Sequence, residues 1–299
     1  MKKNTNSFAN SYLFVLMLFA LCKFTGHAQL TQNVNIGEAT TIPFELHNNK
    51  IFLQIQLFDE NFYVFLDNGA PKTRFPSTII EKFTSLPDSL ICQTFPKLPN
   101  LKDYKKRVML SIGNYDLILD TIRCWPDGMF MLGAELFERR IVNLDFVNET
   151  LTLDNTLPED INTYIAIDMS SQKHENRFGV IQHYFLIHIP DFKDSFSQNI
   201  PLVFFVDLGS MSAFLSDKTI KKVDYEKFIN DPALISYLFS SEMMFNRPNL
   251  RITYSSGGEI SQEEKFAYFD GVIGVDILKR FHNVIFDYQG KKFYVKAQK

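Results

Sequence analysis

Two apolar runs of the chain each end in an Asp-x-Gly triplet that is followed by a small residue. The first run, NFYVFLDNGA, covers residues 61–70, and the second, PLVFFVDLGS, covers residues 201–210. A short apolar run bounded by a glycine turn is typical of a buried strand that enters a tight loop. The pattern therefore predicts two buried strands, with loops that begin at Asp67 and Asp207.

The segments that follow the two triplets also match each other. Residues 74–77 read RFPS and precede TIIEKF, whereas residues 213–216 read AFLS and precede DKTIKKV. Serine is favoured at the start of a helix, because its hydroxyl oxygen accepts a free backbone N–H group. Ser77 and Ser216 are therefore predicted to cap two short helices.

A third match lies farther along each half. Residues 129–153 read MFMLGAELFERRIVNLDFVNETLTL, and residues 271–295 read GVIGVDILKRFHNVIFDYQGKKFYV. In each segment two apolar residues precede a glycine, an acidic residue follows two positions later, and a strand–Asp–turn–strand pattern comes last. Asp67 precedes Gly133 by 66 residues, and Asp207 precedes Gly274 by 67. This constant separation predicts that one structural unit is present twice.

The residues between these landmarks favour β-structure. Residues 107–112 and 115–119 flank Gly113-Asn114 and predict a hairpin, and residues 121–125 predict a further strand. In the second half, residues 251–260 show the same pattern more weakly. The polar stretch DNTLPEDIN, at residues 154–162, predicts a boundary. We therefore expect an N-terminal lobe over residues 29–155 and a C-terminal lobe over residues 156–299.

The first residues have the composition of a secretory signal peptide. Lys2 and Lys3 precede an apolar run at residues 12–22, and small residues end at Ala28. The alternative is an uncleaved membrane anchor, but a membrane span needs about 20 apolar residues and this run is shorter. We therefore expect cleavage after Ala28, export to the periplasm or the exterior, and no stable membrane span in the mature chain.

Composition narrows the class of protein further. The 299 residues are 45% hydrophobic and 22% charged, which is an ordinary globular balance. Thirty phenylalanines and twelve tyrosines favour β-strands. A net charge of -3 offers no electrostatic basis for binding nucleic acid or an anionic membrane. Cys92 and Cys124 remain after signal removal, and the two alternatives are a disulfide, which an oxidising compartment permits, or two separate buried thiols.

The repeated Asp-x-Gly-Ala/Ser motif with a distant apolar–apolar–Gly element resembles a lobe of the retropepsin-like aspartic proteases. LGAELFERRIVNLDF and IGVDILKRFHNVIFDY are similar to the closing part of bacterial members of that family. The resemblance covers nearly the whole mature chain as two fused copies, as in pepsin-like enzymes. It implies an all-β fold of two β-barrel lobes with short helices, related by a pseudo-two-fold axis. It also implies that the two loops meet between the lobes, with Gly133 and Gly274 packed behind them.

The same resemblance implies an aspartic-type endopeptidase that acts on a peptide or protein substrate. Asp67 and Asp207 would share one proton, because two neighbouring carboxylates cannot both ionise readily. The ionised carboxylate would take a proton from water while the other donates to the peptide carbonyl oxygen. This route needs no metal and no cofactor.

The residues around the two aspartates would support this chemistry. They are Asn68, Gly69 and Ala70 in the first loop, and Leu208, Gly209 and Ser210 in the second. Ser210 could donate to the outer oxygen of Asp207. The family normally carries Thr or Ser between Asp and Gly, with a hydroxyl that bonds to the opposite loop. Asn68 can donate and accept hydrogen bonds, whereas Leu208 can do neither.

The absent hydroxyl at position 208 leaves a second function open, a non-catalytic peptide-binding protein on the same fold. A flap over the cleft is expected near residues 96–104, where Tyr104 could cover substrate or could be an ordinary strand tyrosine. The six histidines show no metal-ligand spacing, and His183 and His188 fit strand positions. Asp145 and Asp287 fit structural turns. The sequence does not indicate the oligomeric state.

Overall fold

The computed structural model describes residues 39–82, 87–125, 128–175, 179–193, 199–211, 214–215 and 269–297. The predicted signal peptide at residues 1–28, the helix predicted after Ser216 and the strands predicted within residues 251–260 lie outside these ranges. Where the chain is described, no helix is long and apolar enough to cross a membrane.

The first half consists of short strands with two short α-helices among the described residues. Its strands are β1 (Thr40–His47), β2 (Lys50–Leu57), β3 (Glu60–Leu66), β4 (Arg74–Phe75), β5 (Ile91–Thr94), β6 (Lys102–Tyr104), β7 (Val108–Ile112), β8 (Tyr115–Leu119), β9 (Ile122–Cys124), β10 (Met131–Leu132), β11 (Ile141–Asp145) and β12 (Thr150–Asp154). Its α-helices are α2 (Ser77–Lys82) and α3 (Glu135–Arg139). The predicted β7–β8 hairpin, the strand at β9 and the helix that starts at Ser77 are confirmed.

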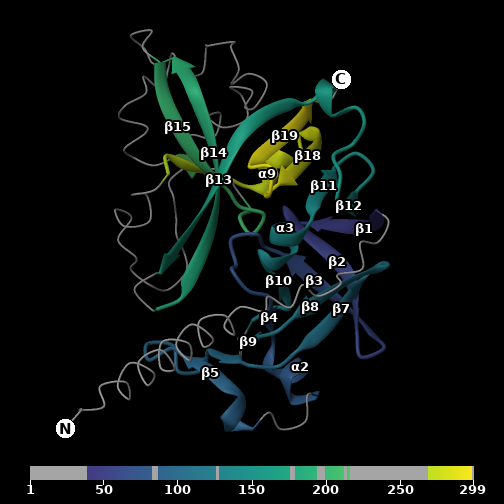
Figure 1. Ribbon diagram of the computed structural model, residues 1–299, viewed down its shortest axis with the longest axis vertical. Helices are drawn as coiled ribbons and strands as arrows, with labels where there is room; N and C mark the ends of the chain where they lie inside the picture. The colour runs from purple at the N-terminus through teal and green to yellow at the C-terminus, as the bar shows by residue number, and fades with distance from the viewer. Residues whose placement is uncertain are drawn as a thin grey trace, which may run out of the picture. The chain divides into compact units, whose positions relative to one another are not determined.

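The second half repeats this order where it is described. Its elements are β13 (Ile165–Glu175), β14 (Ile181–Lys193), β15 (Asn199–Val206), β16 (Phe214–Leu215), β17 (Gly271–Ile273), α9 (Val275–Leu278), β18 (Phe281–Asp287) and β19 (Lys292–Ala297). Figure 1 shows β14 and β15 as long neighbouring strands, in agreement with their antiparallel pairing. The described chain is therefore an all-β fold with short helices, and this prediction is confirmed.

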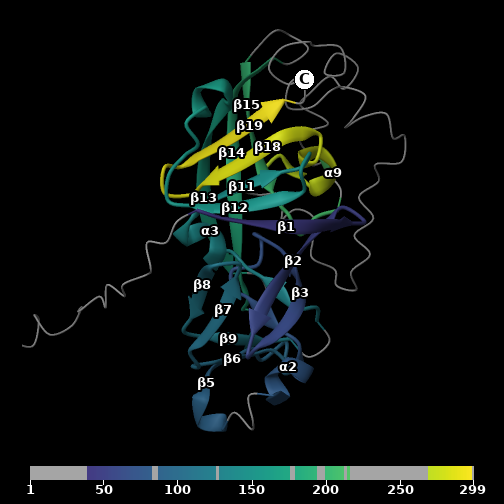
Figure 2. The same cartoon turned by 90° about the vertical axis from the view of Figure 1, so that its right-hand side faces the viewer.

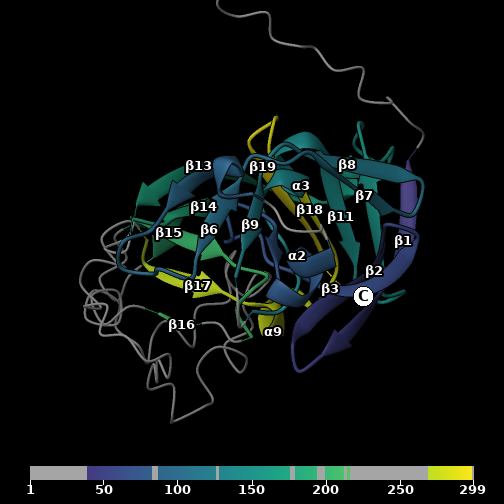
Figure 3. The same cartoon turned by 90° about the horizontal axis from the view of Figure 1, so that it is seen from below.

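The repeat extends to the way strands pair. β3 and β10 are parallel, with Phe65 opposite Met131, and β4 is antiparallel to the other side of β10. In the second half β15 and β17 are parallel, with Phe205 opposite Val272, and β16 is antiparallel to β17. Figure 3 shows β14, β15 and β17 following one another in this sheet. In each half, the strand that leads into the Asp-x-Gly loop therefore pairs with the strand that precedes the second glycine of the repeat, Gly133 or Gly274.

One antiparallel ladder joins the halves. Its strand order is β1–β12–β11–β18–β19–β13, and Figure 2 shows β1, β12, β11 and β18 side by side. At the centre Val142 pairs with Phe286 and Leu144 pairs with Val284. When the second repeat is superposed on the first, each of these pairs takes the place of the other. A local two-fold relation between the two repeats requires this. The pseudo-two-fold axis of the complete lobes stays a prediction.

The core draws on both halves. Alternate residues of β2 are buried, namely Ile51, Leu53, Ile55 and Leu57, as expected for a strand with one face against the core. Phe137 of α3 lies 5.6 Å from Phe185 and 5.1 Å from Phe286, measured between ring centroids. Burial of a phenylalanine stabilises a fold by about 1.5–3 kcal/mol. These contacts therefore hold α3, beside the first loop, against strands of the second half.

The two cysteines are free thiols. β6 lies between β5, which carries Cys92, and β9, which carries Cys124. Two strand spacings amount to about 9–10 Å, whereas a disulfide tolerates a Cα separation of about 7 Å at most. The disulfide alternative is therefore wrong and the two thiols are separate. Cys92 is exposed and Cys124 half-buried, so the expected burial is only partly met.

Candidate active site

The first Asp-x-Gly loop follows β3. The backbone N–H of Asp67 donates to the carbonyl oxygen of Leu132 at 2.9 Å, which anchors the loop to β10. Oδ1 of Asp67 accepts hydrogen bonds from the N–H groups of Gly69, at 2.9 Å, and Ala70, at 3.1 Å. A carboxylate that accepts two backbone N–H bonds has a defined orientation, so the loop holds Asp67 in place.

The second loop has similar internal bonds. The N–H of Asp207 donates to the carbonyl oxygen of Ile273 at 3.0 Å, and Oδ1 of Asp207 accepts from Gly209 at 2.8 Å. The N–H of Ser210 donates to the carbonyl oxygen of Asp207 at 3.1 Å, as that of Ala70 does to Asp67 at 3.2 Å. The two predicted loops therefore share one local structure.

Asn68 connects the two loops. Its Nδ2 donates to the carbonyl oxygen of Val206, and its Oδ1 accepts from the N–H of Leu208, both at 2.7 Å. Asn68 is fully buried, and so is Leu208, which packs into the main hydrophobic cluster. The side chain of Asn68 therefore forms both of these bonds to the second loop, whereas the side chain of Leu208 makes apolar contacts in the core.

The glycines allow the carboxylates to approach each other. A Cβ atom on Gly209 would lie 2.7 Å from Oδ1 of Asp67 and 3.0 Å from Oδ1 of Asp207. A Cβ atom on Gly69 would lie 3.2 Å and 3.3 Å from the same two oxygens, and 2.9 Å from Cζ of Phe205. The two aspartates therefore border the same small space, which side chains at positions 69 and 209 would fill.

Gly133 packs against the backbone of the first loop. A Cβ atom there would lie 2.6–2.8 Å from backbone atoms of Lys72, Ala70 and Thr73. The N–H of Ala134 donates to the carbonyl oxygen of Ala70 at 2.7 Å. In the second half the N–H of Val275, which follows Gly274, donates to the carbonyl oxygen of Ser210 at 3.0 Å.

Two carboxyl groups at this site have altered acidity. Burial raises the pKa of Asp67, although the nearby Arg74 guanidinium and the loop N–H bonds act in the opposite direction. Burial also raises the pKa of Glu135 to about 7. Oε2 of Glu135 accepts from the N–H of Thr73 at 2.6 Å and from its hydroxyl at 2.9 Å. Glu135 therefore stabilises the first loop at Thr73 through these two hydrogen bonds.

Several of these residues were not among the predicted site residues. Glu135 is the acidic residue of the repeated segment, so its recurrence was a signal for a role beside the loop. Arg74 belonged to the second matching segment, but nothing in the sequence pairs its charge with Asp67. Tyr104 lies in β6, between β5 and β9, and is partly buried against the main cluster, which is the setting of an ordinary strand tyrosine.

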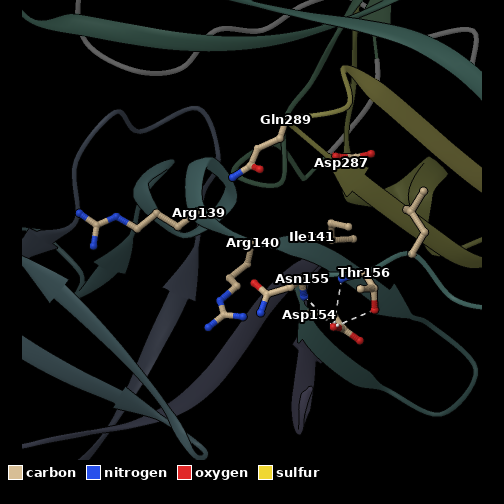
Figure 4. A pocket seen from close by; sticks show the side chains of 9 residues that line it. Arg139, Arg140, Ile141, Asp154, Asn155, Thr156, Asp287 and Gln289 are labelled. Atoms are coloured by element: carbon tan, nitrogen blue, oxygen red, sulfur yellow. Dashed lines mark hydrogen bonds between the residues drawn. The ribbon is translucent and has the colours of Figure 1, made fainter. Parts of the chain in front are cut away.

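A cavity of about 360 Å³ lies away from the two aspartates. Figure 4 shows it between the end of α3, the segment after β12 and the β18–β19 turn, with Arg140, Asp154 and Asp287 among its lining side chains. Asp154 accepts hydrogen bonds from Asn155 and Thr156 of its own turn. Within the described ranges no three His, Cys, Asp or Glu side chains are grouped so that they could hold a metal ion.

No protein-family model matches the sequence. No curated protein matches it either. Among solved structures, the chain is similar to a retropepsin-like aspartic protease from Rickettsia conorii, with 16% identity, a TM-score of 0.31, and coverage of 39% of this chain and 91% of that one. It is also similar to an aspartic proteinase from Irpex lacteus, with 12% identity, a TM-score of 0.48, and coverage of 87% and 98%. Both TM-scores lie below 0.5, so the chain's own residues carry the functional proposal.

Proposed function

We propose that this protein is an exported aspartic-type endopeptidase that hydrolyses peptide bonds between Asp67 and Asp207. The observation that carries the proposal is the meeting of the two loops. Asn68 bonds to Val206 and Leu208 of the opposite half, and both aspartates border the space beside Gly209. Export is proposed from the composition of residues 1–28.

The proposed reaction uses one proton shared by the two carboxyl groups. The ionised carboxylate removes a proton from a water molecule, whose oxygen attacks the peptide carbonyl carbon. The protonated carboxyl group donates its proton to the carbonyl oxygen, and the amine leaves with a proton when the C–N bond breaks. The raised pKa of Asp67 supports a pair that keeps one proton in mildly acidic solution. A direct hydrogen bond between the two carboxyl groups stays a prediction.

One observation favours a second function, a peptide-binding protein without catalysis. Leu208 occupies the position at which the family carries a hydroxyl, and it is fully buried among apolar side chains. Its side chain offers no hydrogen bond to the first loop, so of these two residues Asn68 alone has a side chain that can form hydrogen bonds across the loops. A groove that binds extended peptides requires no such orientation.

Variants of the two aspartates distinguish these functions. We expect the mature protein to begin at Gln29 by N-terminal sequencing, and to cleave unfolded protein substrates best at acidic pH. Asp67→Asn and Asp207→Asn should each abolish cleavage, because neither carboxyl group works without the other. Asp116→Asn is the matched control, because Asp116 is exposed on β8 and its carboxylate accepts a hydrogen bond from the hydroxyl of Ser111.

Cleavage that survives Asp207→Asn would refute the catalytic pair. Binding of peptides by the native protein, with no cleavage between pH 3 and 7, would favour the second function. A mature protein that retains residues 1–28 in a membrane fraction would contradict the proposed export.

A further inference from the structure

A row of charged side chains crosses the first-half sheet next to the Asp67 loop. Arg74 on β4 lies opposite Met131 of β10 on one side and opposite Arg123 of β9 on the other. Arg123 in turn lies opposite Asp103 of β6. Residues directly opposite each other on paired strands share one face of the sheet. The row therefore places two arginines side by side, with one carboxylate beyond them.

Asp103 neutralises only part of this positive charge. Its Oδ1 accepts from Nε of Arg123 at 2.8 Å, and its Oδ2 accepts from Nη2 of Arg123 at 3.0 Å and from Nζ of Lys72 at 2.8 Å. Asp103 is fully buried and Arg123 nearly so. One carboxylate thus serves two cations, and no ion pair to Arg74 is found within the described part of the chain.

Arg74 is held in place, but one of its donors has no hydrogen-bond acceptor among the described residues. Its guanidinium lies 4.7 Å from the centroid of the Trp125 ring, so the aromatic face supports it. Nε of Arg74 and Nη1 of Arg123 are buried without a hydrogen-bond partner among the described residues. A buried donor without an acceptor destabilises a fold, because the group has lost its hydrogen bonds to water. This loss of stability suggests that a ligand supplies the missing hydrogen-bond acceptor.

Arg74, whose Nε lacks an acceptor among the described residues, lies near the proposed active site. Arg74 and Lys50 both act electrostatically on Asp67. The hydrogen bonds that Oδ1 of Asp67 accepts come from loop N–H groups rather than from Arg74. Arg74 is partly exposed, whereas Arg123 beside it is closed off from solvent. A ligand bound beside Asp67 would therefore meet the guanidinium of Arg74.

We propose that Arg74 forms a subsite that binds a carboxylate of the peptide substrate, from an acidic side chain or a free C-terminus. The planar guanidinium presents parallel N–H donors that match the two oxygens of a carboxylate. Arg123 and Lys72 add positive charge near it, and the ring of Trp125 lies 4.7 Å from its guanidinium. This inference rests on the proposed function and names a substrate class for the same site: peptides with an acidic residue close to the scissile bond.

Peptide binding tests this subsite without any need for cleavage. The full mature chain with Asp207→Asn is titrated with fluorescent peptides blocked at both ends that differ only by Glu or Gln at one position, scanned along the peptide. At one position the Glu peptide should bind roughly tenfold more tightly, the effect of one charge-assisted bond. A third peptide with Gln and a free C-terminus tests the other source of the carboxylate.

Two further variants identify the residue responsible. Arg74→Gln should reduce the Glu preference to about onefold, whereas Arg139→Gln, at an exposed arginine on α3, should leave it unchanged. Circular dichroism and thermal unfolding verify that each variant is folded. Equal binding of Glu, Gln and free-acid peptides at every position, or absence of peptide binding, would overturn the subsite. Cleavage by the native protein is measured separately, so the proposed function can hold even if the subsite fails.

Discussion

At the scale of single residues, Asn68 is the side chain that bonds across the two Asp-x-Gly loops. Its carboxamide both donates to Val206 and accepts from Leu208. We expect Asn68→Ala to lower the free energy of unfolding by about 2–4 kcal/mol, because two buried backbone groups lose their partners at once. Urea denaturation measures this loss.

Asn68→Thr is the matched control for that change. A threonine hydroxyl can donate and accept, so it should retain more of the stability than alanine does. If the alanine variant were as stable as the native protein, Asn68 would not hold the two loops together.

Leu208 offers a second prediction at the same scale. Leu208→Thr should raise the rate of peptide cleavage about tenfold, equivalent to about 1.4 kcal/mol of activation free energy, by restoring a hydroxyl between the loops. It should also lower stability by about 1–3 kcal/mol, because an apolar side chain leaves the core. Cleavage rates and urea denaturation are both measured, with Leu208→Val as the control of similar shape. Equal rates for the Thr and Val variants would show that the hydroxyl has no role.

The sequence could predict the residues that its own repeat marks. Asp67, Asp207 and the glycines after them recur in matching contexts, and Asn68 was recognised as able to donate and accept. Arg74 could not be assigned in this way, because its interaction with Asp67 depends on β4 and β3 flanking the same strand, β10. That arrangement arises from pairing between distant segments, which no local pattern of residues specifies.

At the scale of elements, the junction between β10 and α3 supports the first loop. A side chain at Gly133 would meet three backbone atoms of residues 70–73, and a backbone cannot move aside as a side-chain tip can. We expect Gly133→Ala to destabilise the protein by about 1–3 kcal/mol and to reduce cleavage by displacing residues 70–73. Thermal unfolding measures the loss of stability, amide hydrogen exchange of Ala70 and Thr73 measures the displacement of the loop, and cleavage rates measure the loss of activity.

Gly290→Ala is the control for this prediction. The three atoms nearest to a Cβ atom at Gly290 all belong to the side chain of Asp287, in the β18–β19 turn. Its effect on exchange at residues 70–73 should be absent. A Gly133→Ala protein with native exchange in this loop would show that the packing tolerates a methyl group.

The elements divide into those that a local pattern reveals and those that it does not. The β7–β8 hairpin was predictable because apolar residues alternate on both sides of Gly113-Asn114. The two-residue strands β4 and β10 are too short to show any period. The insertion of β6 between the strands of Cys92 and Cys124 likewise cannot be deduced from cysteine spacing, and this is why the disulfide alternative failed.

At the scale of the whole molecule, the repeat predicted two similar halves, and the structure adds how they are joined. The β11–β18 pairing and the contacts of Phe137 link them through hydrogen bonds and core packing. His183 adds a third link, since its backbone N–H donates to the carbonyl oxygen of Gly69 at 3.3 Å. These links require partners in both halves, so a search for similarity within the sequence could not locate them.

Near these links, burial shifts the pKa values of two side chains, His183 and Glu135, in opposite directions. The side chain of His183 is fully buried, and Nδ1 lies 3.3 Å from Oε1 of Glu138. Burial lowers the pKa of His183 from 6.5 to about 4, although Glu138 acts in the opposite direction. Burial raises the pKa of Glu135 from 4.5 to about 7. Both groups are therefore neutral in the folded protein over most of the range between these values.

The consequences for stability follow from proton binding in the two states. Between pH 6.5 and 4 the unfolded chain binds a proton at His183 that the folded protein excludes, so stability falls as the pH falls through this range. Between pH 4.5 and 7 the folded protein retains a proton on Glu135 that the unfolded chain releases, so stability falls as the pH rises. The two effects oppose each other between pH 4.5 and 6.5.

We therefore expect these two groups to produce a plateau of stability in mildly acidic solution, and single variants should remove it. Relative to the native protein, His183→Phe should lose stability as the pH rises from 4 to 6.5, because the variant lacks the His183 effect. Relative to the native protein, Glu135→Gln should gain stability as the pH rises from 4.5 to 7, because the variant lacks the Glu135 effect. Each slope relative to the native protein approaches at most about 1.4 kcal/mol per pH unit, the value for one proton. Urea denaturation from pH 4 to 8 gives these difference curves, in which the contributions of other groups cancel, and the double variant should restore a flat difference between pH 4.5 and 6.5. Difference curves without slope in either single variant would show that neither group titrates differently in the folded and unfolded states.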